Sequence, residues 1–162
     1  MTETVFGPND VPTVFFVSKS DGEGQVDYGL RLDDACLPVG EEPVVPYWRE
    51  YENFIYLGGT HPLSWLDRRA YGVADQRVVK RSAEGAELAI RLRPLSRELT
   101  ISVSKGSDGK CRAVAHTTIG AVAAAEFTSA YIKLKSRMSV EYIELRGKHA
   151  DTGETLTERL TP

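Results

Sequence analysis

Alternation of apolar and polar side chains is the feature that most constrains the fold of this 162-residue chain. Residues 26–32, 87–93 and 98–104 each place an apolar side chain at every second position. A period of two is the side-chain period of a strand with one buried face. We therefore predict an all-β, mainly antiparallel protein that closes around one core.

Turn-forming residues separate the alternating runs at short intervals along the chain. The expected strands cover residues 13–17, 25–32, 44–51, 76–81, 87–93, 98–105, 110–118, 123–135, 139–146 and 154–160. About 9–10 strands with such spacing predict a β-barrel or a two-sheet sandwich with one short helix, and the short turns favour the barrel. Residues 1–12 are expected to form an irregular N-terminal lead-in, and residues 13–162 a single domain.

Two segments depart from the regular alternation. Pro46 interrupts the strand at 44–51 and cannot donate to a ladder, which predicts an edge strand or a bulge. Leu63, Leu66 and Ala70 recur with helical spacing, so we expect a helix of about ten residues that starts near Pro62 and has these side chains facing inward. Gly72 is placed to end this helix.

Composition and terminal residues bear on the compartment and on the partners. Hydrophobic residues make up 41% and charged residues 27%, which are ordinary globular values. The sequence lacks an apolar run near the roughly 20 residues of a membrane helix, so we expect no membrane insertion. The N-terminal residues lack a signal peptide, which indicates a cytoplasmic protein, or a periplasmic one if a leader is removed.

Charge is spread unevenly along the chain. Residues 1–52 hold eleven acids and three bases, whereas residues 53–162 hold twelve acids and 17 bases. Such asymmetry marks either an anion-binding face or a solvated face balanced by acids across the fold. The pI of about 5.7 and the lack of interleaved aromatic residues argue against nucleic acid as a partner.

The two cysteines, Cys36 and Cys111, are too few for a disulfide scaffold. Cys111 shares its strand parity with Ala113 and Ala115, which predicts a core position, whereas Cys36 lies in an acidic loop. We expect no bridge between them and a more reactive Cys36.

Catalytic and cofactor motifs are lacking in the sequence. His61, His116 and His149 do not lie at metal-ligand spacing from one another, and residues 57–60 lack the ending of a phosphate loop. We therefore predict no catalytic residue, no metal and no cofactor, and an enzyme is the less favoured interpretation.

One stretch carries a resemblance to a known family. The segment PVVPYW at 43–48, followed by LSWLDRRAYGV at 63–73, resembles a bacterial family of small β-rich proteins, the DUF4833-like domains of unknown function. The resemblance covers most of residues 13–160. It implies a self-contained domain and singles out the shared motif positions, which are Tyr47, Trp48, Asp67, Arg68, Arg69, Tyr71 and Gly72.

Aromatic and arginine side chains in these motifs form the candidate site. Tyrosine and tryptophan suit the lining of a ligand cavity, and a guanidinium holds a carboxylate or phosphate in two-point contact. Core packing and an arginine–aspartate network are the structural alternatives, and we expect Trp48 to be mostly buried. The predicted ligand-binding residues are Tyr47, Trp48, Arg49, Arg68, Arg69 and Tyr71.

Three functions stay open on the sequence. The first is a non-catalytic β-barrel that binds a small or partly apolar ligand, or an anionic one, in a cavity bounded by the helix. The second is a protein-interaction module, docking a partner or a second copy, whose barrel is filled by side chains. The third is an enzyme whose residues come from separate strands.

Overall fold

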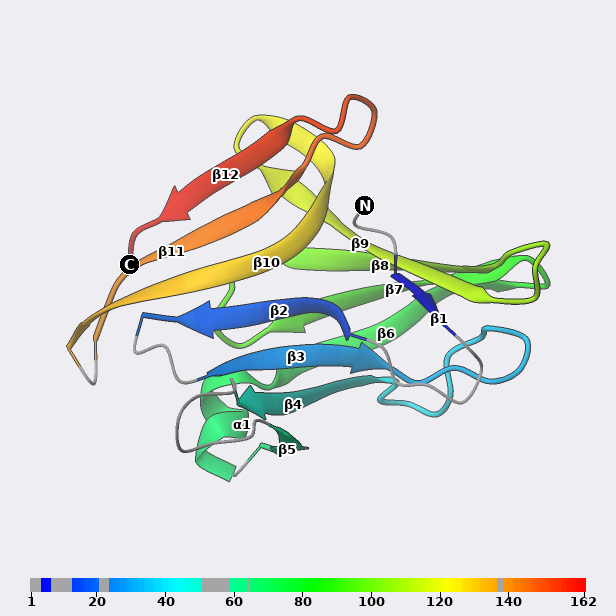
Figure 1. Cartoon of the computed structure of the whole chain (residues 1–162), viewed down its shortest axis with the longest axis horizontal. Coiled ribbons are helices and arrows are strands. Elements are labelled where there is room, and N and C mark those ends of the chain that lie inside the picture. The colour runs from blue at the N-terminus through cyan, green and yellow to red at the C-terminus, as the bar shows by residue number, and fades with distance from the viewer. Residues whose placement is uncertain (1–3, 7–12, 21–23, 51–58, 64, 137–138) are drawn as a thin grey trace.

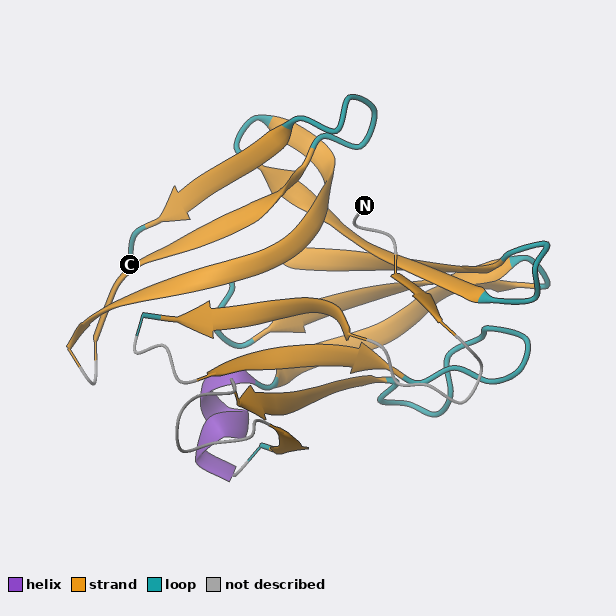
Figure 2. Cartoon of the chain, viewed as in Figure 1, coloured by secondary structure: helices purple, strands orange, loops and turns teal. Residues whose placement is uncertain are grey.

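A computed structural model of the chain describes residues 4–6, 13–20, 24–50, 59–63, 65–136 and 139–162. These residues form twelve strands and one helix (Figures 1 and 2). In chain order the elements are β1 Thr4–Phe6, β2 Thr13–Lys19, β3 Gly24–Leu30, β4 Val44–Glu50, β5 Gly59–Pro62, α1 Trp65–Tyr71, β6 Val73–Ser82, β7 Gly85–Leu92, β8 Glu98–Lys105, β9 Cys111–Ile119, β10 Val122–Ser136, β11 Ser139–Lys148 and β12 Thr155–Leu160. The predicted all-β class is confirmed.

All twelve strands belong to one curled sheet with the order β5-β4-β3-β2-β10-β9-β8-β7-β6. Strand β11 adds to β10, β12 adds to β11, and β1 adds to β9. The pairing of β10 with β2 is parallel, so the sheet is mixed rather than wholly antiparallel. The predicted barrel or sandwich takes the form of a half-barrel, in which the two ends of one sheet approach each other (Figure 1).

The long strand β10 causes this curl. Its first half, from Val122 to Phe127, pairs with β9, and its later residues from Ser129 to Ile132 pair with β2. One strand therefore serves both the layer of β2, β3 and β4 and the layer of β6 to β9 behind it (Figure 1). The apolar faces of the two layers meet, because each alternating strand buries one face.

Side chains fill the space between the two layers. Phe15 stacks on Tyr28 with ring centroids 4.8 Å apart and meets Phe127 edge-on at 5.3 Å. The alternating apolar residues of β7 and β8 are buried, as predicted, with Leu88 and Leu99 fully enclosed. The core is therefore packed with aromatic and aliphatic side chains at its centre.

A side chain, rather than a backbone ladder, joins the two ends of the curled sheet. The Oε1 of Gln76 on β6 accepts the backbone N–H of Val44 on β4 at 2.9 Å. Its Nε2 donates to the Val44 carbonyl oxygen at 3.2 Å. Pro46 lies two residues further along β4, before β5 begins to pair at Tyr47, so β4 is an edge strand only up to Pro46 and is paired on both sides beyond it.

The helix begins later than the sequence predicts. Gly59–Pro62 pair with β4 as strand β5, so α1 starts only at Trp65. Leu63 is buried as expected, but Ala70 is exposed, which corrects the predicted inward stripe, and the side chain of Leu66 lies outside the described residues. The N–H of Gly72 donates to the Arg68 carbonyl oxygen, so the predicted end of the helix is confirmed.

A buried hydroxyl fixes the end of the helix to the core. Tyr28 donates its hydroxyl proton to the carbonyl oxygen of Tyr71 at 2.5 Å. Burial raises the pKa of the Tyr28 hydroxyl, so this group stays protonated and acts as a donor. No helix in the described part of the chain is long and apolar enough to cross a membrane.

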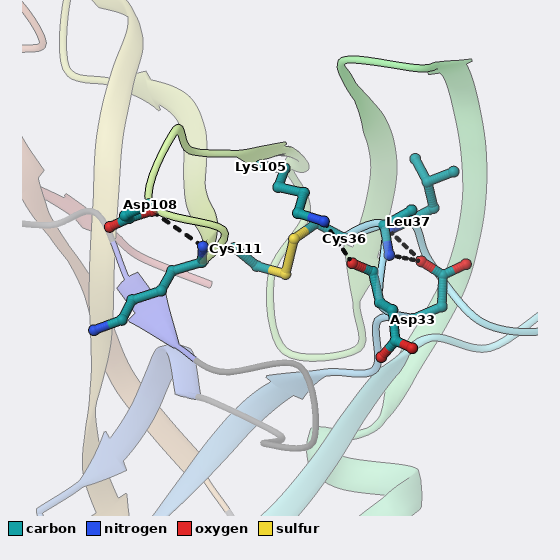
Figure 3. The surroundings of a disulfide bond; sticks show 9 residues. Asp33, Cys36, Leu37, Lys105, Asp108 and Cys111 are labelled. Atoms are coloured by element: carbon teal, nitrogen blue, oxygen red, sulfur yellow. Dashed lines mark hydrogen bonds between the residues drawn. A yellow bond between two sulfur atoms is a disulfide. The ribbon is translucent and has the colours of Figure 1, made fainter.

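Cys36 and Cys111 form a disulfide, which corrects the expectation of two separate thiols (Figure 3). Their Cα atoms lie 5.3 Å apart, and both residues are buried, so Cys36 is not the exposed thiol predicted from its loop. The alternation pattern placed Cys111 correctly in the core, but alternation carries no information about which loop lies beside that strand.

Polar contacts hold the same loop, residues 31–43, against the strands beside it. The Asp33 carboxylate accepts the N–H groups of Ala35 and Leu37, and Lys105 donates to the Asp34 carbonyl oxygen (Figure 3). Arg81 on β6 donates to the carbonyl oxygen of Pro38. The loop therefore covers one end of the half-barrel as an ordered cap.

Candidate ligand-binding site

A cleft of about 740 Å³ opens where β4 faces β6 and α1, and we call it the seam cleft. Its apolar wall consists of Val44, Val45, Pro46, Leu63 and Val73. The seam forms here because the sheet curls without closing: Pro46 offers no N–H to a further ladder, and Gln76 satisfies the backbone of Val44. Side chains therefore line the gap.

Three arginines from distant parts of the chain also line the seam cleft. Arg31 follows β3, Arg68 lies in the last turn of α1, and Arg93 follows β7. All three are exposed, and within the described residues none of them has an ion-pair partner. Glu42 is the one acid among the described residues that line this cleft, so the lining carries an excess of positive charge.

Backbone hydrogen bonds hold the segments that carry these arginines. The N–H of Arg31 donates to the Pro43 carbonyl oxygen, and the Arg31 carbonyl oxygen accepts the N–H of Val39. The N–H of Arg93 donates to the carbonyl oxygen of Gly72, directly after α1. A Cβ atom on Gly72 would overlap the Arg68 carbonyl oxygen, so only glycine lets the chain turn here.

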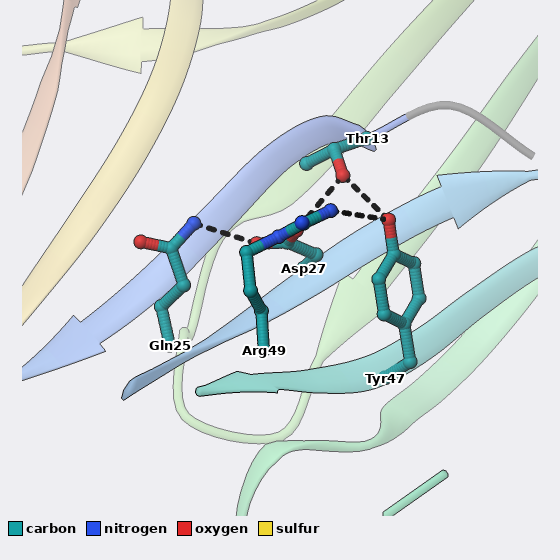
Figure 4. A network of polar contacts seen from close by, with 5 residues as sticks. All are labelled: Thr13, Gln25, Asp27, Tyr47 and Arg49. Atoms are coloured by element: carbon teal, nitrogen blue, oxygen red, sulfur yellow. Dashed lines mark hydrogen bonds and ion pairs between the residues drawn. The ribbon is translucent and has the colours of Figure 1, made fainter. Parts of the chain in front are cut away.

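Of the six predicted ligand residues, Tyr47 and Arg68 line the seam cleft. Tyr47 also belongs to a polar network on the outer face of β2, β3 and β4 (Figure 4). Its hydroxyl lies 2.6 Å from the Thr13 hydroxyl, which donates to Asp27 at 3.0 Å. Tyr47 therefore connects the network to the cleft.

Arg49 is committed to this network. Its Nε donates to Asp27 Oδ2 at 2.5 Å, and Gln25 donates to Asp27 Oδ1 at 2.7 Å (Figure 4). The hydrogen bond to the carboxylate raises the pKa of the Arg49 guanidinium. Asp27 is 1% exposed and accepts three donors, so it is a buried charge with satisfied partners. Arg49 thus pairs with an aspartate, but the pair joins β4 to β3, whereas the alternative considered on the sequence ties the helix to the strand.

Trp48 and Tyr71 lie on the core side of the sheet. Trp48 packs against the core with most of its surface covered, as predicted, but it is not fully enclosed. The Lys19 ammonium stands 5.0 Å from the Trp48 ring and 5.5 Å from the Tyr71 ring. Cation–π attraction thus joins β2, β4 and the end of α1. Arg69 is exposed and is not among the residues that line the seam cleft.

A second hollow of about 890 Å³ lies over β8 and β9, with polar residues such as Thr100, Ser102 and His116 along it. Ala124 and Ala150 are the apolar residues among its described lining. Ligand sites commonly combine larger apolar side chains with a few convergent polar groups, and the described lining of this hollow has no apolar side chain larger than alanine. The seam cleft fits that description better.

Metal and thiol chemistry find no support in the described part of the chain. No three side chains of histidine, cysteine, aspartate or glutamate come together there as a metal would require. Both cysteines are bound in the disulfide, which removes them as nucleophiles.

Comparison with known proteins identifies the family. The family model described as Domain of unknown function (DUF4833) matches residues 15–159. No curated protein and no solved structure matches the chain. Because the match covers most of the sequence, the chain belongs to this family, and the resemblance of the PVVPYW and LSWLDRRAYGV motifs is confirmed.

Proposed function

For this member of a family without an assigned activity, we propose a non-catalytic β module that binds a small, partly apolar ligand in the seam cleft. The observation that carries the proposal is a cleft of about 740 Å³ with an apolar wall and convergent polar side chains. Ligand pockets commonly range from roughly 300 to 1,000 Å³ and combine these two kinds of lining. The adjacent helix bounds the cleft through Arg68 and Gly72.

A fluorescent probe tests the proposal. We expect 8-anilinonaphthalene-1-sulfonate, an apolar anion, to bind the folded protein with a saturable rise in emission. Val73→Trp places an indole in the cleft wall and should abolish this rise, because Val73 lines the cleft. Val79→Trp is the matched control on the same strand, since Val79 is 51% exposed and lies outside the cleft. Equal probe binding by both variants contradicts the proposal.

Native mass spectrometry of gently purified protein gives a second test. A retained small molecule that is lost from Val73→Trp and kept by Val79→Trp supports the seam cleft as its site. A molecule retained equally by both variants places the site elsewhere. The same spectra report whether the chain is a monomer or a homodimer.

A protein-interaction module is the second candidate. On the outer face of β10, β11 and β12, Arg146 stacks on Tyr131 at 4.9 Å and Arg159 on Tyr142 at 4.2 Å. Glu144 accepts hydrogen bonds from both arginines. Tyrosine and arginine are enriched where proteins dock, which supports this candidate. Sedimentation of the purified protein as a monomer, with no change on Tyr142→Ala, counts against a homodimer through this face.

The disulfide bears on the cellular compartment of the protein, whichever of the two functions it has. Disulfides persist in oxidising compartments and are rare in the cytosol. A buried bridge between Cys36 and Cys111 therefore favours the periplasmic alternative over the cytoplasmic one. Lysis of cells directly into denaturant with excess alkylating reagent, followed by mass analysis of the protein, tests this: unmodified cysteines support the bridge, and two alkylated cysteines contradict it.

A further inference from the structure

The seam cleft gathers positive charge from three separate elements. We infer that its ligand carries an oxyanion headgroup, a carboxylate or a phosphate, which Arg31, Arg68 and Arg93 hold together. The inference rests on the proposed function and names the class of ligand for that site. The apolar wall then contacts the uncharged part of the same ligand.

Charge balance carries the first step. Three guanidiniums line a cleft of about 740 Å³ in which Glu42 is the one described acid. A cleft whose lining carries an excess of positive charge attracts an anion. Guanidinium groups match carboxylate and phosphate oxygens with two parallel N–H donors, so oxyanions are their natural partners.

Contrast with other arginines carries the second step. Arg49, Arg97 and Arg146 each contact a carboxylate within the chain, at 2.5, 2.5 and 2.8 Å. The fold thus supplies internal acids to arginines that tie strands together. The arginines of the seam cleft have no such acid among the described residues, although Glu42 lines the same cleft.

Fixed backbone positions carry the third step. Arg31 is held at both its N–H and its carbonyl oxygen, and the N–H of Arg93 is bonded to Gly72. Arg68 lies in the last helical turn, and the Tyr28 hydroxyl anchors that turn through the Tyr71 carbonyl oxygen. A site whose backbone is ordered in advance loses less entropy when a ligand binds.

The position of the apolar wall carries the last step. Val44, Val45 and Pro46 come from one strand edge and are continuous along it, and the largely buried Leu63 adds to the same wall. The arginines come from the chain segments around this edge. An amphiphilic anion, with a charged head and an aromatic or aliphatic body, satisfies both parts of the lining at once.

Calorimetric titration with three matched probes tests the inference: 2-naphthoate, 2-naphthyl phosphate and the neutral 2-naphthamide. We expect both anions to bind about tenfold more tightly than the amide, since charge-assisted hydrogen bonds are stronger than neutral ones. Tighter binding of the phosphate assigns a phosphate ligand, and tighter binding of the naphthoate assigns a carboxylate ligand. Added salt should weaken anion binding alone.

Arginine variants locate the binding. Arg31→Gln, Arg68→Gln and Arg93→Gln should each weaken anion binding about three- to tenfold and leave amide binding unchanged. Arg91→Gln is the control, because it removes the same charge from an exposed position on β7 that does not line the cleft.

Three outcomes overturn the inference, and they are distinguishable. If the amide binds as tightly as the anions, and Val73→Trp still blocks all three probes, the oxyanion headgroup is wrong and the ligand cleft stands. If none of the probes binds, the cleft and its headgroup both fail. An equal loss of anion binding in Arg91→Gln also overturns the assignment, because it reports only the net charge of the protein.

Discussion

Gln76→Ala probes the contact that joins the two ends of the sheet. The wild-type amide makes two hydrogen bonds to Val44, at 2.9 and 3.2 Å, and Val44 is 3% exposed. A net hydrogen bond contributes roughly 0.5–1.5 kcal/mol, so the loss of both costs about 1–3 kcal/mol of unfolding free energy. Water that enters from the seam cleft forms hydrogen bonds with the exposed backbone groups of Val44 and recovers part of this free energy. We therefore expect the unfolding free energy to fall by about 2 kcal/mol.

Urea unfolding measures this cost as a shift of the midpoint at constant slope. Val79→Ala is the matched control, because Val79 lies three residues further along β6 and is 51% exposed, and its effect should stay within about 0.5 kcal/mol. Hydrogen exchange gives a local measurement: the Val44 amide should lose protection in Gln76→Ala while core amides such as that of Ile101 keep theirs.

If Gln76 joins the two ends of the sheet, Gln76→Ala must change hydrogen exchange at Val44 locally, which a general loss of stability would not do. If Gln76→Ala destabilises no more than Val79→Ala, the Gln76 amide does not join the sheet ends. If Val44 exchange is unchanged while the whole protein is weakened, Gln76 acts through packing, and the reasoning about the backbone of Val44 is refuted.

Three further changes test other parts of the fold. Replacing Cys36 and Cys111 together by serine should cost about 3–4 kcal/mol in urea unfolding, because the bridge closes a loop with a separation of 75 residues; a loss below about 1 kcal/mol contradicts this. Trp48→Ala should cost about 2 kcal/mol, less than for a fully enclosed aromatic residue, and a loss above about 4 kcal/mol would indicate complete burial. The hydrogen bond from Arg97 lowers the pKa of Glu158 below its ordinary 4.5, so the pair stabilises the fold above pH 4.5 and this stabilisation is lost as the pH falls through the lowered pKa. Glu158→Gln should therefore lower the unfolding free energy at neutral pH and match the wild type in acid. A difference that does not change with pH would exclude the ion pair as the cause.

Alternation predicted the strands well because burial on one face is a local property of the sequence. Each of the ten expected strands corresponds to an observed strand, with ends that shift by a few residues. The pattern missed β1 and β5, since three or four residues are too short to show a period. Gly59 and Pro62 also read as turn residues, and only pairing with β4 makes their segment a strand.

Long-range contacts explain what the sequence did not predict. Arg31 and Arg93 follow strands far apart in the chain, and they meet at one cleft only because β10 curls the sheet. Tyr47 and Arg68, which also line this cleft, were predicted because each lies in a short contiguous motif. The disulfide was missed for the same reason as the arginine cluster: no local pattern indicates that the loop of Cys36 lies beside β9.

The position of the cleft follows from how a curled sheet must treat its edges. Unpaired backbone groups at an edge need a partner, a cover or a residue that has no donor. This chain uses all three along one seam: the Gln76 side chain bonds Val44, Pro46 lacks an N–H, and β5 covers β4 from Tyr47 onward. Because the backbone groups at this edge already have partners or lack a donor, only the side chains determine which molecules the cleft contacts. A gap that a ladder would otherwise fill is therefore free to hold a ligand without loss of a backbone hydrogen bond.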